Sequence, residues 1–92
     1  MVYIMALDNI KRYLKRSNEF AELFLAPPIE LATLTTHQYN YLQEHIEYEL
    51  SPENLTNDGE LPYNEVHFRA KHFEAALKEL HDFAIHHNFG AH

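Results

Sequence analysis

The chain has 92 residues, of which 46% are hydrophobic and 23% charged, and it contains no cysteine. These values are typical of one globular domain with a modest core, and they exclude a disordered chain, disulfides and a thiolate metal site. No apolar run approaches the roughly 20 residues of a membrane-spanning helix. We therefore expect one helical domain over residues 1–89, cytoplasmic and without a membrane partner, and we interpret residues 90–92 as a tag remnant.

Charge is distributed unevenly along the chain, whose formal net charge is −7. Residues 17–68 contain ten carboxylates and no lysine or arginine, so this segment carries a charge of −10. Such a segment repels phosphate backbones and disfavours a nucleic-acid partner. The exception is a basic cluster, which we interpret as the solvated face of a helix, with DNA binding as the alternative. This cluster consists of Lys11, Arg12, Lys15 and Arg16.

Apolar or small residues at steps of three and four predict an amphipathic first helix. It should start between Val2 and Asn9, with Asp8 as the cap of the shorter version, and end near Leu25. Pro27-Pro28 stops any helix before it. The predicted core-facing positions are Tyr3, Leu7, Ile10, Leu14, Ser17, Ala21 and Phe24, widened by Phe20 and Leu23.

The second helix is predicted from a capping box, because Thr35 is followed three residues later by Gln38. It should end at Leu50, since Pro52 follows. The preceding residues 29–34 are compatible with a short extended piece, a turn or a helical turn. The predicted core face of the second helix consists of Tyr39, Leu42, Ile46 and Leu50.

The third helix is predicted from Asn64, a plausible N-cap, to about Gly90, a plausible stop. A strand over Val66–Ala70 is the alternative, but the helical pattern continues well past it. At about 24 residues this helix is longer than the others, so it overhangs its partners or packs on another chain. We expect an all-α fold, a small three-helix bundle with a long C-terminal helix. Its predicted seam is Val66, Ala70, Phe73, Leu77, Leu80 and Ala84, broadened by Ala76 and Phe83.

No motif for catalysis, a cofactor or a metal stands out. Glu79, Asp82 and His86 share one helical face, and we interpret them as a solvated charged face because no second ligand set accompanies them. The only serines, Ser17 and Ser51, do not lie in a nucleophile elbow, and two glycines cannot form a phosphate-binding loop. We therefore expect neither an enzyme nor a metal or cofactor site.

Aromatic and histidine side chains on the second helix predict a surface for protein contact. Such side chains have apolar bodies and polar tips, which suits partly wet interfaces. The alternative is that they flank the core and reach water at their tips. Three apolar residues off the main seam of the third helix favour a second interface. The predicted interface residues are His37, Tyr41, His45, Tyr48, Phe68, Ile85 and Phe89.

These observations together favour a small acidic, non-catalytic protein-interaction module. We expect it to self-associate, as a homodimer or another homo-oligomer, and to bind a macromolecular partner, as accessory proteins of phage and mobile elements do. The alternative is an immunity protein or DNA mimic that sequesters a basic partner, which the −10 segment favours. Salt-sensitive binding to a basic protein would distinguish the second role from the first.

Overall fold

The computed structural model describes residues 6–87 and shows an all-α fold, as predicted. No strand occurs in this part of the chain, so the strand alternatives are excluded there. None of the helices between residues 6 and 87 is both long and apolar enough to span a bilayer. The elements in chain order are α1 (Asp8–Glu22), the 3₁₀ turn η1 (Leu31–Thr33), α2 (Thr36–Glu49), the one-turn α3 (Pro52–Leu55) and α4 (Tyr63–His86).

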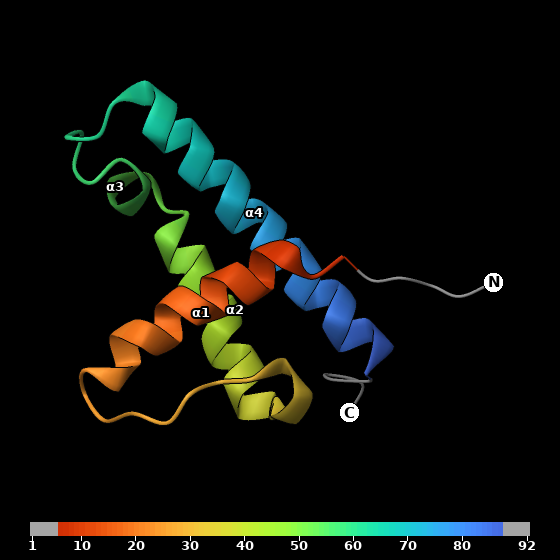
Figure 1. Ribbon diagram of the computed structural model, residues 1–92. Helices are drawn as coiled ribbons and strands as arrows, with labels where there is room; N and C mark the ends of the chain where they lie inside the picture. The colour runs from red at the N-terminus through yellow and green to blue at the C-terminus, as the bar shows by residue number, and fades with distance from the viewer. Residues whose placement is uncertain (1–5, 88–92) are drawn as a thin grey trace.

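The long helix α4 is the centre of the bundle. Both α1 and α2 pack on it, and α3 contacts α2 and α4 (Figure 1). The predicted seam of α4 lies in the core from Phe73 onward, where Leu80 and Ala76 are fully buried, whereas Val66 and Ala70 are only partly buried and lie outside it. Leu42 and Ile46 of α2 and Ile10 of α1 are also fully buried. The hydrophobic core thus forms where the three long helices meet, and the first turns of α4 extend beyond it.

The N-terminus of α1 is capped by a side chain from α4. Glu79 Oε1 accepts hydrogen bonds from the backbone N–H groups of Asn9 (2.8 Å) and Ile10 (3.0 Å), and Glu79 Oε2 accepts one from Asn9 Nδ2 (2.8 Å). Asp8 was predicted to cap this helix, but it is the first helical residue, and Leu7 precedes it without a side-chain cap. The interpretation of Glu79 as part of a solvated face was also wrong. It is buried because unpaired N–H groups at a helix start attract a carboxylate.

Local sequence signals determine α2 and the loop that follows it. The Thr35–Gln38 capping box is present in both directions, and the helix ends with Leu50 as C-cap. Residues 57–59 have φ values of 50°, 57° and 85°. This left-handed geometry is the one that asparagine, aspartate and glycine tolerate best, so the Asn-Asp-Gly sequence suits the turn.

The second half of α1 does not follow the predicted stripe. Leu14 is its last buried residue, and three side chains assigned to the core stripe are exposed: Phe20 by 65%, Leu23 by 77% and Phe24 by 69%. The physical reason is that α1 crosses α4 early and then continues past it, so no element covers its last turns (Figure 1). The apolar residues do follow a helical period, but only the first half of α1 packs against the core.

The connection between α1 and α2 is ordered by a mid-helix asparagine. Asn18 Nδ2 donates to the Ile29 carbonyl and Asn18 Oδ1 accepts from the Ile29 N–H, both at 2.9 Å. Within the open segment 29–34 a 3₁₀ turn forms, and Leu34 is buried in the core. At the start of α4, Pro62 rather than Asn64 is the N-cap. The predicted positions Tyr3 and Gly90 lie outside the described residues.

Candidate functional site

An open cleft of about 490 Å³ lies between α1, α2 and α4. Its walls carry tyrosine, histidine and charged side chains from these three helices. Tyr13 and Arg16 come from α1, His45 and Glu49 from α2, and Arg69 from α4. None of these elements is near another in sequence, so the bundle itself assembles the site.

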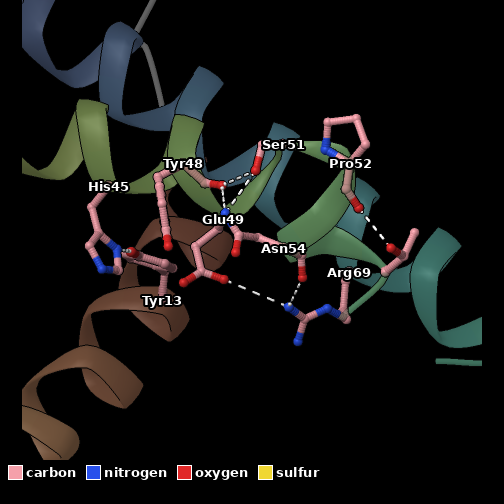
Figure 2. A network of polar contacts seen from close by, with 9 residues as sticks. Tyr13, His45, Tyr48, Glu49, Ser51, Pro52, Asn54 and Arg69 are labelled. Atoms are coloured by element: carbon pink, nitrogen blue, oxygen red, sulfur yellow. Dashed lines mark hydrogen bonds and ion pairs between the residues drawn. The ribbon is translucent and has the colours of Figure 1, made fainter. Parts of the chain in front are cut away.

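A tyrosine–histidine hydrogen bond joins α1 to α2 across the cleft. The Tyr13 hydroxyl contacts His45 Nδ1 (Figure 2). Burial, with Glu49 as the next cause, raises the pKa of Tyr13 above its ordinary value. The raised pKa keeps the phenol protonated. We assign the phenol as the donor and Nδ1 as the acceptor, which places the ring proton of His45 on Nε2, where it can be donated to another group. Tyr13 was not among the predicted site residues, because a buried tyrosine on a helix seam resembles any core residue.

An ion pair connects the end of α2 to α4. Glu49 Oε2 lies 3.7 Å from an Arg69 guanidinium nitrogen, which also donates to the Asn54 carbonyl at 3.4 Å. The guanidinium lies 5.4 Å from the centre of the Phe73 ring. Both charged side chains are partly exposed, so we expect the pair to contribute less than about 1 kcal/mol. Its main effect is to neutralise the carboxylate at this edge of the cleft.

The one-turn helix α3 is attached to the same network. Asn54 Nδ2 donates to the Tyr48 carbonyl at 2.9 Å and to Ser51 Oγ at 2.8 Å (Figure 2). Ser51 Oγ donates to the same carbonyl at 2.8 Å. The Ser51 N–H also donates to this carbonyl at 3.2 Å, so the two side chains add to a backbone bond at the C-terminus of α2. Ser51 and Asn54, which belong to the segment after α2, therefore hold this segment against the end of α2.

His72 lies between the cleft and a second groove and contributes to both linings. Burial lowers its pKa below the ordinary value, and the positive charges of Arg12 and Arg16 lower it further, whereas Glu79 opposes the shift. Its Nδ1 is 3.4 Å from Asn9 Oδ1. At neutral pH this histidine is therefore uncharged and adds no positive charge to the two arginines beside it.

The structure brings together three of the predicted interface residues. The ring of Tyr41 stacks on His45 with centroids 5.7 Å apart, and the centroids of His45 and Tyr48 are 6.4 Å apart. His37 is exposed at the other end of α2. The remaining three do not join this group. Phe68 is exposed near the start of α4, Ile85 is exposed near its end, and Phe89 lies outside the described residues.

An apolar surface at the end of α1 was not predicted as an interface. We call it the α1-end patch, and it consists of Phe20, Leu23, Phe24 and Leu25. The Phe20 and Phe24 rings have centroids 5.3 Å apart, and Leu25 is 94% exposed. Phe20 also lines the cleft, as does Tyr41 of α2, so one residue of the patch and one tyrosine of α2 border the same hollow. The sequence pattern did not reveal the patch, because three of its four residues, Phe20, Leu23 and Phe24, continue the period of the core stripe.

Leu25 has a backbone conformation that favours glycine. Its φ is 57°, and it follows the last turn of α1. The Ala26 N–H bonds to the Ala21 carbonyl and the Leu25 N–H to the Glu22 carbonyl, each at 3.1 Å. This is the Schellman arrangement, in which glycine is usual and an L-residue costs about 1 kcal/mol. A leucine in this position holds a large apolar side chain out into solvent.

The cleft can form hydrogen bonds and ring contacts through the side chains that line it. Among residues 6–87 no group of three or more histidines and carboxylates is placed to hold a metal ion. The proposed face of Glu79, Asp82 and His86 does not form one, since Glu79 turns to α1 and Asp82 pairs with Lys78 at 3.1 Å. Comparison with protein-family models, curated proteins and solved structures found no match.

Proposed function

We propose that this chain is a small acidic protein-interaction module that binds a macromolecular partner, associates with copies of itself and carries no catalytic site. We place it in the cytoplasm. The observation that carries the proposal is the α1-end patch. Contiguous apolar side chains that are 65% exposed or more are uncommon on a monomeric protein unless a partner covers them.

Two features of the surroundings support this role. Tyr41 and Tyr48 are 51% and 62% exposed, and tyrosine is enriched at the centres of protein interfaces. The cleft, which both Tyr41 and Phe20 line, offers hydrogen-bond donors from His45 and Arg69. An apolar surface beside a polar, partly wet hollow has the composition expected of a non-obligate protein interface.

Site-specific photo-cross-linking in the source cells tests the patch directly. A photoreactive side chain at Leu23 should give discrete protein adducts, whereas the same side chain at Lys15, exposed on the same helix, should give few. Adducts with a different protein identify the partner. Adducts with twice the mass of the chain assign the patch to self-association and still support an interaction module. Equal yields at the two positions, or none at either, would contradict the proposal.

A second candidate, sequestration of a basic partner by an immunity protein or DNA mimic, is favoured by the acidic surface of α2 and the loop after it. Six of the seven carboxylates between residues 44 and 65 are exposed. Within the described residues only Glu49 of this set forms an ion pair. Salt distinguishes the two roles, because binding through these carboxylates would weaken steeply with ionic strength and binding through the patch would not.

A further inference from the structure

A groove of about 710 Å³ lies between α1 and the first half of α4 and shares His72 with the cleft. We call it the basic groove and define it by Arg12, Tyr63, His67, Phe68 and Lys71. The Tyr63 ring is 80% exposed and stacks on His67, and Phe68 is 68% exposed. No carboxylate is among the described residues that line it. The charged side chains of this groove are therefore the cations Arg12 and Lys71, although the chain has a net charge of −7. They lie in the same groove as the exposed rings of Tyr63 and Phe68.

A second surface, on α2, has the opposite charge. Tyr41, Glu44 and Tyr48 follow His37 on α2 at steps of four, three and four, so the four side chains form one line along the helix. All four are exposed, as is the neighbouring Glu47. The helix α2 contains no lysine or arginine. We call this line the acidic stripe.

The distribution of charge limits which surfaces of two copies of the chain can form a contact. Two copies of net charge −7 repel each other at long range, and an acidic stripe facing another acidic stripe would add repulsion between carboxylates at contact. An acidic stripe facing a basic groove replaces that repulsion with attraction. We infer that the acidic stripe of one copy docks into the basic groove of a second copy, as a helix lies in a groove.

The inference rests on the self-association part of the proposed function, and it assigns surfaces to it. In this contact Glu44 faces the cations of the groove, and the Tyr41 and Tyr48 rings contact Tyr63 and Phe68. The charges are available for it, since neither the cations Arg12 and Lys71 nor the carboxylates Glu44 and Glu47 form an ion pair within residues 6–87. The stripe and the groove belong to different helices, so each copy offers both halves of the contact.

Charge reversal on each side, followed by mixing, tests the pairing. A groove variant carries Arg12→Glu and Lys71→Glu, and a stripe variant carries Glu44→Lys and Glu47→Lys. Circular dichroism checks that both keep the helix content of the wild type. In sedimentation at low salt, each variant alone should associate at least about tenfold more weakly than the wild type. An equal mixture should regain association, because the reversed groove of one fits the reversed stripe of the other.

The outcomes separate this inference from the proposed function. Wild-type association that neither variant weakens, or a mixture that stays monomeric, overturns the stripe–groove contact and leaves the interaction module in place. A wild type that is monomeric at every concentration overturns both the contact and the self-association part. A single-stranded oligonucleotide that binds the wild type but not the groove variant would reassign the basic groove to nucleic acid and overturn the contact.

Discussion

Glu79 and Asn9 are 70 residues apart in the sequence, yet the Glu79 carboxylate accepts hydrogen bonds from both the backbone and the side chain of Asn9. Together with the bond to the Ile10 N–H, Glu79 does for α1 what an N-cap side chain usually does for its own helix. The interaction also fixes the point at which α1 crosses α4. The position of Tyr13 and Arg16 in the cleft depends on that crossing point.

Replacing Glu79 by alanine should therefore destabilise the fold strongly. The change leaves two N–H groups at the start of α1 without an acceptor, one of them in a buried bond, and we expect a loss of about 2–4 kcal/mol in the free energy of unfolding. Chemical denaturation measures it. The matched control is Glu74→Ala, an exposed glutamate on the same helix, which should change stability by less than about 0.5 kcal/mol. Equal effects would show that the tertiary cap contributes nothing.

The core of α4 can be tested with a pair of apolar residues on the same helix. Leu80→Ala removes a fully buried side chain and should cost about 2–5 kcal/mol, because a cavity remains. Ile85→Ala removes a side chain that is 71% exposed and should cost less than about 0.5 kcal/mol. Thermal or chemical unfolding compares the two. A larger loss for the second variant would mean that another chain covers Ile85.

Leu25→Gly should raise stability while it weakens the α1-end patch. Glycine adopts the left-handed conformation without the steric cost that leucine has there, so we expect a gain of about 0.5–1 kcal/mol. The control Leu23→Gly removes an equally apolar side chain at a position with φ −63°, and it should lower stability by about 1 kcal/mol. When the photoreactive side chain is placed at position 24 instead of 23, both variants should reduce the yield of protein adducts. A Leu25→Gly variant less stable than the wild type would show that its side chain makes contacts in the free protein.

Tyr13→Phe isolates the hydrogen bond between α1 and α2. The ring stays in the core, but His45 Nδ1 loses its donor, and we expect a cost of about 0.5–1.5 kcal/mol. Tyr48→Phe is the matched control, because its ring is 62% exposed and it should have little effect. The imidazole resonances of His45, followed by NMR, should shift in the first variant only. An unchanged His45 spectrum in Tyr13→Phe would refute the assigned tautomer.

His72 gives the fold a dependence on pH whose sign follows from its lowered pKa. The folded state favours the neutral ring because of burial and the charges of Arg12 and Arg16, with Glu79 opposing. The unfolded chain therefore binds a proton first, near pH 6.5, and stability falls as pH decreases through that value towards the folded pKa. The melting temperature of His72→Asn should fall less than that of the wild type between about pH 7.5 and about pH 5.5. A control at the exposed His37, His37→Asn, should behave like the wild type, and identical slopes for all three proteins would contradict the assignment.

Much of the helix pattern was determined by the sequence alone, because the signals are local. Thr35 and Gln38 satisfy each other's backbone groups three residues apart, and Asn57-Asp58-Gly59 adopts a turn that these residue types tolerate. The period of Phe73, Leu80 and Ala84 predicted the buried seam of α4 correctly. These features depend on residues within one or two helical turns of each other, so no tertiary information was needed to find them.

The candidate site was decided by the tertiary structure. Tyr13 and His45 meet only because α1 and α2 pack on the same central helix, and the burial of Glu79 depends on where the start of α1 lies. Periodicity states that one face of a helix is apolar, but it does not state how far a second element extends to cover that face. Phe20 and Phe24 have the same helical phase as core residues, yet they are exposed because α4 covers only the first half of α1.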